Sequence, residues 1–227
     1  MPGRTTTTGA EATSADDSPP GGPDGAAAGS ATPPASATAP GARREQLLAA
    51  AARLMADRGY HGVSINDIGA AAGVSGPAVY KHFPSKQAIL TELLVGISER
   101  LLAEGTVRAQ AASPDEALDA LVRWHVSFAL GSPELIRLQD RDLASMDETA
   151  ARSVRRLQRR YVEIWVAQLR ARDPGIAEDA ARAAVHAAFG LLNSTPYSAT
   201  GGAARLGRAR MADLLHRLGM AALHAAS

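Results

Sequence analysis

The sequence predicts an all-α protein of about nine helices, and three observations carry this prediction. Apolar residues make up 46% of the chain but aromatic residues only 4%, so alanine and leucine must do most of the packing, and alanine favours helix over strand. Apolar side chains recur with a period near 3.6 residues from Arg43 onward, and no segment alternates as a strand would. Cysteine is absent, which excludes disulfides, thiolate nucleophiles and cysteine-bound metal.

Residues 1–40 have a different composition from the rest of the chain. They hold many Gly, Ser, Thr, Ala and Pro residues and no Leu, Ile, Val, Phe or Trp. Such a segment cannot bury enough apolar surface to offset the entropy lost on ordering. We therefore expect a disordered tail, with a passive extension favoured over a role in contacting DNA or a partner.

The next unit that the sequence predicts, residues 41–101, contains four helices. Gly59 ends the first helix, Gly73 ends the second and Pro84 ends the third. Ser64 and Asp67 have the spacing of a capping box at the start of the second helix. The expected helices cover residues 43–58, 64–72, 75–83 and 85 to at least 101.

Residues 102–227 predict five further helices. Two of them begin at a Ser-Pro-Asp or Ser-Pro-Glu sequence, which places proline at the first helical position, where its missing N–H does no harm. A loop is expected over 195–202. The expected helices cover 113–131, a segment from 132, and 147–172, 177–193 and 203–225.

Residues 64–83 have the layout of a helix-turn-helix motif. Two short helices must cross steeply through a tight turn, and Gly73 suits the backbone of such a turn. The second helix is then available to enter a major groove. Residues 41–90 carry a net charge of +3, from six Lys and Arg against three Asp and Glu, and a compact basic segment is a mild indication of nucleic-acid binding.

The stretch Arg43–Leu101, and above all its segment AAGVSGPAVYKHFPSKQAIL, resembles the DNA-binding domain of the TetR family of bacterial transcriptional regulators. The later helices agree with that family in number and layout. The resemblance implies a homodimer that binds double-stranded operator DNA with an inverted repeat. We expect it to be cytoplasmic, because the polar N-terminus lacks the apolar core of a secretion signal. The resemblance further implies a repressor that a small-molecule effector releases, with 102–227 as the effector-binding and dimerisation domain.

The resemblance also assigns DNA contacts by position. The side chains that match phosphate-binding positions are Tyr80, His82 and Lys86, and those that match base-facing positions are Gly76, Pro77, Ala78 and Lys81. Ser64 and Ser75, at helix N-termini, complete the candidate DNA-binding set. Gly69 stands where the family usually has alanine, which weakens that helix by up to ~1 kcal/mol.

Aromatic residues gather in the helices that the resemblance assigns to an effector pocket. The candidate ligand-binding residues are Trp124, Phe128, Tyr161, Trp165, His186, Phe189 and Asn193. They favour an apolar ligand, although a plain aromatic core has the same pattern. An arginine stripe over 152–160 suits an anionic, acyl-coenzyme A-like effector, but a solvated helix face is the favoured interpretation.

No motif indicates catalysis, a metal site or a cofactor. The chain lacks HExxH, GxSxG, a phosphate loop and a dinucleotide fingerprint, and its six histidines are scattered. We therefore expect no enzyme, no catalytic residue, no metal and no cofactor. No apolar run reaches the ~20 residues that cross a bilayer, so we expect no membrane contact. An activator, a ligand-independent regulator, and a helical enzyme or carrier that retains the fold remain as alternatives.

Overall fold

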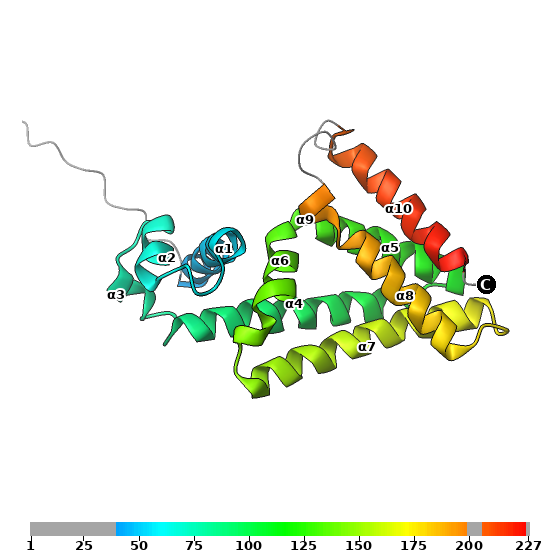
Figure 1. The fold of residues 1–227 in the computed structure, drawn as a ribbon, viewed down its shortest axis with the longest axis horizontal. Helices are drawn as coiled ribbons and strands as arrows, with labels where there is room; N and C mark the ends of the chain where they lie inside the picture. Colours follow the sequence, from blue (N-terminus) through cyan, green and yellow to red (C-terminus); the bar gives the residue numbers. More distant parts are fainter. Residues whose placement is uncertain (1–39, 199–205, 226–227) are drawn as a thin grey trace, which may run out of the picture. The chain divides into compact units, whose positions relative to one another are not determined.

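The computed structural model describes residues 40–198 and 206–225, and this part of the chain forms helices and no strand (Figure 1). The predicted all-α fold is confirmed, because each of the nine expected segments contains a helix. The helices are α1 (Pro40–Arg58), α2 (Ile65–Ala71), α3 (Gly76–Val79), α4 (Lys86–Arg108), α5 (Pro114–Gly131), α6 (Pro133–Asp142), α7 (Glu148–Arg172), α8 (Glu178–Leu192), α9 (Thr195–Ser198) and α10 (Arg208–His224), with a 3-10 turn, η1 (Leu143–Ser145), between α6 and α7.

Some boundaries differ from the prediction. The single turn α9 begins at Thr195, where the sequence predicts a loop. Helix α3 ends at Val79 rather than at Phe83, because the Lys81 and His82 amides bond to carbonyls three residues back instead of four. Helix α4 continues to Arg108.

Two parts of the prediction lie outside the described residues. The chain divides into two units, 1–37 and 38–227, and every described residue belongs to the second. The predicted tail, 1–40, is therefore not described except for Pro40, at which α1 begins. The start expected for the last helix, at residue 203, is also not described, and α10 begins at Arg208.

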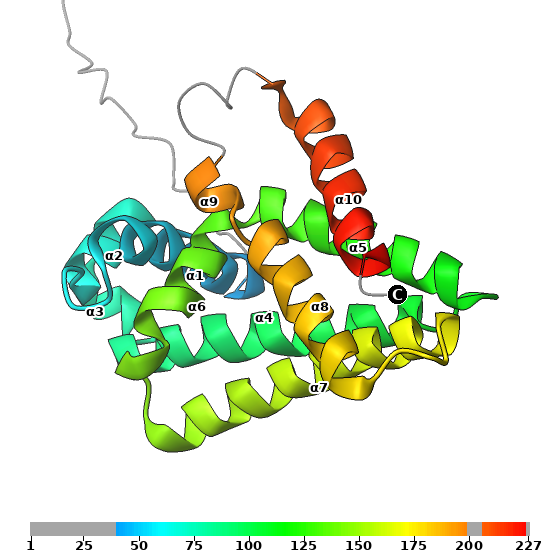
Figure 2. The same ribbon diagram turned by 45° about the vertical axis from the view of Figure 1, so that its right-hand side comes forward.

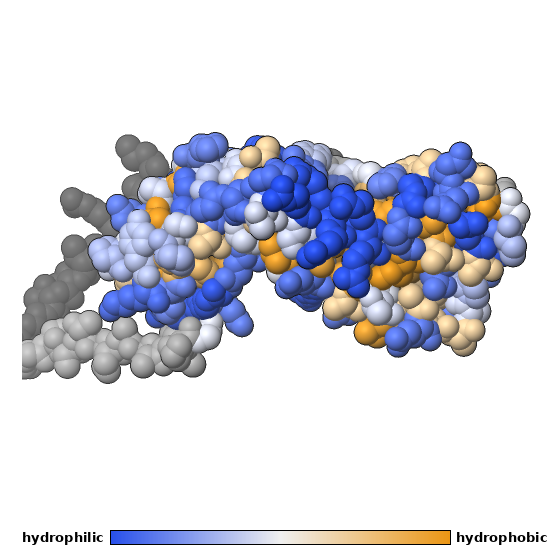
Figure 3. Space-filling view, turned by 90° about the horizontal axis from the view of Figure 1, so that it is seen from below, coloured by the Kyte–Doolittle hydropathy of each residue, from blue (hydrophilic) through white to orange (hydrophobic). Residues whose placement is uncertain are grey.

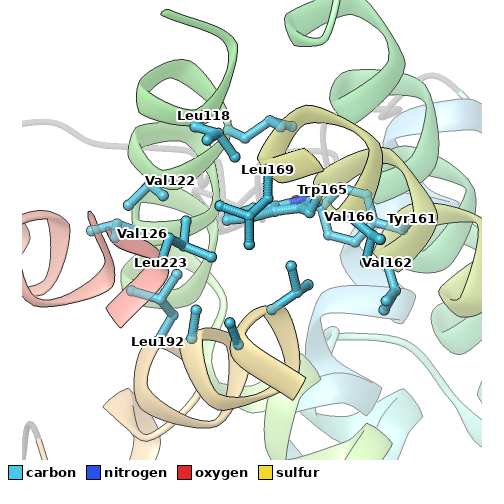
Figure 4. Packing of buried hydrophobic residues seen from close by; sticks show 14 of the residues in the cluster. Leu118, Val122, Val126, Tyr161, Val162, Trp165, Val166, Leu169, Leu192 and Leu223 are labelled. Atoms are coloured by element: carbon cyan, nitrogen blue, oxygen red, sulfur yellow. The ribbon is translucent and has the colours of Figure 1, made fainter. Parts of the chain in front are cut away.

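Two clusters of buried apolar side chains hold the second unit together, and α4 contributes to both. Ile89 and Leu94 in its first half pack with α1, α2 and α3, and also with η1 and the start of α7. Ile97 and Leu101 in its second half pack with α5, α7, α8 and α10. Figure 4 shows the second cluster, in which Trp165 projects from α7 toward side chains of the neighbouring helices.

The arrangement of the long helices explains how the two clusters share α4. Helices α4 and α7 lie side by side and run in the same direction (Figure 1). Helix α6 crosses beside them and packs on α1, while α10 packs on α8 and α5 (Figure 2). No helix among the described residues is long and apolar enough to span a membrane.

Candidate DNA-binding surface and effector cavity

The turn between α2 and α3 depends on close backbone approach. Gly73 has a φ of +70°, in the left-handed region that favours glycine. A Cβ on Gly69 would lie 2.9 Å from the Val74 carbonyl oxygen, and one on Gly76 would lie 1.8 Å from Asn66 Oδ1. The glycine at position 69 therefore lets the turn pack directly against α2, which gives a steric reason for the departure from alanine.

A capping box fixes the start of α2, as the sequence predicts. The Ser64 hydroxyl accepts a hydrogen bond from the Asp67 amide at 3.1 Å and donates its own proton to Asp67 Oδ2 at 2.6 Å. The Ser64 amide donates to the same carboxylate oxygen at 2.8 Å. These bonds from Ser64 hold the pKa of Asp67 below its ordinary value. The proton of the exposed Ser64 hydroxyl is therefore used within the capping box.

The second helix of the motif presents most of its candidate side chains to solvent. Tyr80 is 56% exposed, and Lys81 is exposed beside it. The other exposed members of the candidate set on this segment are Ser75 and Pro77, and the half-buried ones are Ala78 and His82. Gly76 differs from these, because it is buried against Asn66.

Lys86 lies at the first position of α4 and has its ammonium group bound within the protein. Its Nζ donates to the carbonyl oxygens of Tyr60 and Val63, each at 2.7 Å. It also lies 4.3 Å from the centre of the Tyr60 ring, a cation-π contact. The structure thus assigns Lys86 to holding the loop before α2 against α4, and these partners differ from the phosphate that the sequence suggests.

Two further cations of the basic segment have internal partners. Arg43 donates to the Ala72 carbonyl at the end of α2, at 3.1 Å. Arg44 pairs with Glu92 on α4 and lies 4.5 Å from the centre of the Phe83 ring. Part of the positive charge that indicates nucleic-acid binding therefore serves to join α1, α2 and α4.

A cavity of about 190 Å³ lies among five helices, α4 to α8. Each of these helices supplies two or three lining residues, and the residue that follows α8 adds one more. The lining residues are Ser98, Leu101, His125, Phe128, Ile136, Gln139, Gln158, Tyr161, Val162, His186, Phe189 and Asn193.

A buried histidine links three helices at this cavity. His125 is 2% exposed, with Nδ1 3.2 Å from the Tyr161 hydroxyl and Nε2 3.0 Å from Asn193 Oδ1. Burial lowers the pKa of His125 to about 4, so the ring is neutral at pH 7. Since Asn193 Oδ1 can only accept, Nε2 carries the ring proton and Nδ1 accepts from Tyr161.

Five of the seven candidate ligand residues line the cavity, and the two tryptophans do not. Trp165 is fully buried behind the lining, with its ring centre 4.8 Å from that of Phe189. Trp124 stacks on Phe128 and has the Arg108 guanidinium 5.1 Å from its ring centre. Each tryptophan thus shares a helix face with a lining residue but packs behind the lining.

Several lining residues were missed by the sequence prediction. Gln158 shares a helix face with Tyr161, Val162 and Trp165, at positions i, i+3, i+4 and i+7. An uncharged polar residue at the edge of an aromatic face was the signal that could have found it. Gln139 and Ile136 on α6 gave no such signal, because only the fold brings α6 to the cavity.

The arginine stripe of α7 lies on the surface. Arg152 and Arg155 are 3.7 and 3.6 Å from Glu148, and the other arginines of the stripe, Arg156, Arg159 and Arg160, are exposed. Figure 3 views the side on which α7 lies and shows strongly hydrophilic residues gathered there. None of these arginines lines the cavity.

A helix-turn-helix that presents its second helix, joined through one long helix to a bundle around a cavity, defines a DNA-binding transcriptional regulator. Two family models match the chain. The model described as bacterial regulatory proteins, tetR family, matches residues 47–93, and that described as tetracyclin repressor-like, C-terminal domain, matches residues 111–216. The chain belongs to the TetR family.

Solved structures share the fold at low sequence identity. A TetR-family regulator from Bordetella parapertussis is 23% identical, with a TM-score of 0.68 over 78% of this chain and 93% of that one. The regulator PfmR from Thermus thermophilus is 24% identical, with a TM-score of 0.67 over 78% and 97%. AibR, solved with isovaleryl coenzyme A and operator DNA, is 19% identical, with a TM-score of 0.65 over 78% and 97%. A search of curated protein sequences finds no match.

Proposed function

We propose that this protein is a dimeric repressor that leaves its operator when a small molecule fills the cavity. The observation that carries the proposal is the course of α4. Lys86 at its start holds the loop that leads into the helix-turn-helix, while Ser98 and Leu101 farther along line the cavity. A change in the cavity that moves α4 therefore also moves the DNA-binding helices.

Helix α6 supplies a second mechanical link between the cavity and the DNA-binding helices. Ile136 and Gln139 line the cavity from α6. One turn farther along, Arg141 donates to the Met55 carbonyl at the end of α1, and the buried Asp142 carboxylate accepts from the Tyr60 amide at 3.3 Å. A ligand that fits one position of α4 and α6 better than the other favours that position, and only this difference in affinity can drive release.

On the DNA side, Lys81 is the residue that reads bases, because its exposed ammonium can donate to guanine O6 or N7. Tyr80 and His82 donate to phosphates, and Ser75 and Pro77 face the groove at the start of α3. Ala78 can touch a thymine methyl group. Since Pro77 and Ala78 are short and Lys81 is the one long side chain placed to read bases, we expect modest direct readout.

We place the dimer interface on α8 and α10. Helix α8 exposes Ala183, Ala187 and Gly190 on one face, and α10 leaves Leu218 43% exposed. Small and apolar side chains on two adjacent helices allow the same helices of a second copy to pack closely. A two-fold dimer requires an inverted-repeat operator with half-sites about one helical turn apart.

The effector is apolar or acyl-coenzyme A-like under this proposal. The aromatic lining supports an apolar group, and AibR was solved with isovaleryl coenzyme A. The regulator acts without catalysis, because its mechanism needs only binding at two coupled sites.

The test begins with selection of bound fragments from genomic DNA, which yields the operator. Lys81→Ala should then reduce the preference for operator over random DNA, whereas Arg100→Ala, which removes an exposed charge from α4, should leave that preference unchanged. A ligand that binds the cavity should weaken operator binding, and the operator should weaken ligand binding by the same factor. Equal ligand affinity with and without operator would support a ligand-independent regulator, and increased transcription from the bound promoter an activator. Turnover of a ligand would support an enzyme.

A further inference from the structure

The size of the cavity limits what can fill it. Its volume is about 190 Å³, and a cavity of roughly 150 Å³ in another protein binds benzene. The rings of Phe128, Tyr161 and Phe189 line it together with aliphatic side chains. The enclosed part of a ligand is therefore about one ring with a short substituent.

The lining contains no charged side chain. Among the described residues, none of those around the cavity is Asp, Glu, Lys or Arg. The lining holds two buried titratable groups: His125, which is neutral at pH 7, and Tyr161, whose pKa is raised by burial so that its hydroxyl keeps its proton. His186 lies exposed at the edge. An anion in this cavity would lose its hydration without gaining a cation, which costs far more than burying a neutral polar group. The arginines of α7 do not offset this cost, because they lie on the surface outside the lining.

One polar group of the cavity wall lacks a partner. His125 has both ring nitrogens bound, to Tyr161 and Asn193, and the Ser98 hydroxyl donates to the Leu94 carbonyl at 2.7 Å. Gln158 Nε2, in contrast, is buried with no hydrogen-bond partner among the described residues. A buried N–H donor without an acceptor costs about 1–3 kcal/mol, and a ligand that brings an acceptor removes this cost.

We propose that the part of the effector that this cavity encloses is an uncharged group of about one ring that carries a carbonyl or similar acceptor, bound by Gln158 Nε2. This inference rests on the proposed function, because it names the ligand class of the same site. It narrows the earlier choice: an ionised carboxylate or a coenzyme A phosphate does not enter the cavity.

Three probes of nearly equal shape test the proposal by calorimetry on the full-length protein at pH 7. Acetophenone has the ring and the carbonyl, ethylbenzene lacks the acceptor, and benzoate replaces the methyl group by a charge. Acetophenone should bind at least about tenfold more tightly than benzoate. Gln158→Leu should weaken the binding of acetophenone by about five- to tenfold. The affinity for ethylbenzene should stay the same or increase.

Gln168→Leu is the matched control, because Gln168 lies half-buried on the same helix, donates to the Ala109 carbonyl and does not line the cavity. It should leave all three affinities unchanged. Benzoate binding as tightly as acetophenone, or acetophenone unaffected by Gln158→Leu, would overturn the ligand class.

Operator titrations separate this inference from the proposed function. If an acyl-coenzyme A releases the operator while acetophenone does not bind, the ligand class is wrong and the repressor mechanism stands. If acetophenone binds through Gln158 with equal affinity in the presence and absence of operator, the ligand class stands and the coupling is wrong.

Discussion

The helix-turn-helix and the cavity differ in the sequence distance between interacting polar groups. In the helix-turn-helix, Ser64 bonds to Asp67 only three residues away, although Lys86 and Arg44 there reach partners 23 to 48 residues away. At the cavity, His125 joins partners 36 and 68 residues away. Contacts close in sequence leave a pattern in the sequence itself, whereas distant ones exist only once the helices have packed.

The two regions also use charge differently. The helix-turn-helix region is basic, yet Lys86 and Arg44 use their charges to join its helices, so Lys81 is left as an exposed cation beside α3. The cavity is lined without charge and relies on a neutral histidine. Removing a charged side chain should therefore lower stability in the helix-turn-helix region. At the cavity, stability should instead depend on pH, because a change of pH can put a charge on the neutral histidine.

The largest effect should come from Lys86→Met. The change removes two charge-assisted hydrogen bonds, each worth about 1.5 kcal/mol at the lower end of their range, and a cation-π contact. We expect the free energy of unfolding to fall by about 3 to 4 kcal/mol, measured by urea denaturation.

The salt dependence of DNA binding separates this structural role from a phosphate contact. If Lys86 only holds the loop, the folded variant should keep the wild-type slope of log affinity against log salt. A slope lower by about one unit, with unchanged stability, would show that Lys86 neutralises a phosphate and would contradict the internal role.

The next effect concerns the cavity and appears as a pH dependence. A histidine in an unfolded chain titrates near pH 6.5, whereas the pKa of His125 in the folded protein is about 4. The unfolded chain thus binds more protons between these values. The contribution of the neutral His125 ring to the free energy of unfolding is fully present above pH 6.5. It falls by about 3 kcal/mol as the pH is lowered to 4.

Thermal unfolding across this pH range provides the measurement. His125→Gln should make stability depend less on pH than it does in the wild type. The same change also lowers stability at pH 7. His186→Gln is the control, since His186 is exposed, and should leave the dependence unchanged. Parallel pH curves for wild type and His125→Gln would show that His125 takes up its proton at the same pH in the folded and unfolded chains, which would contradict its lowered pKa.

The same comparison explains how much could be predicted from the sequence. The helices, the capping box at Ser64 and the exposure of Lys81 follow from local pattern. The sequence could not show that Lys86 faces inward, because its partners are backbone carbonyls that carry no residue signature. Trp165 was assigned to the lining because helical spacing gives the face of a residue but not its depth, and packing alone places it behind Phe189.

A smaller effect is expected from Gly69→Ala, which restores the residue usual in the family. Helix propensity favours alanine by up to ~1 kcal/mol. The new Cβ would lie 2.9 Å from the Val74 carbonyl oxygen and 3.2 Å from the Gly76 nitrogen, and such overpacking costs about 1–3 kcal/mol. Because these neighbours are backbone atoms and cannot easily move, the cost of the clash should exceed the gain in helix propensity. We expect the free energy of unfolding to fall by about 1 to 2 kcal/mol. A rise in the melting temperature would show that the turn can move away.

The smallest effect is expected from Tyr80→Phe, which removes one hydroxyl from an exposed side chain. If that hydroxyl donates to a phosphate, its loss should weaken operator and random DNA equally, by about three- to tenfold, with no change in stability. Tyr60→Phe is the matched control, because the Tyr60 hydroxyl donates to Gln87 Oε1 at 3.1 Å inside the protein. It should lower stability without changing the DNA affinity of the folded protein. Fluorescence anisotropy on both DNAs, with urea denaturation of both variants, distinguishes the two roles. A loss confined to the operator would make Tyr80 a reader of bases, and no loss on either DNA would remove it from the interface.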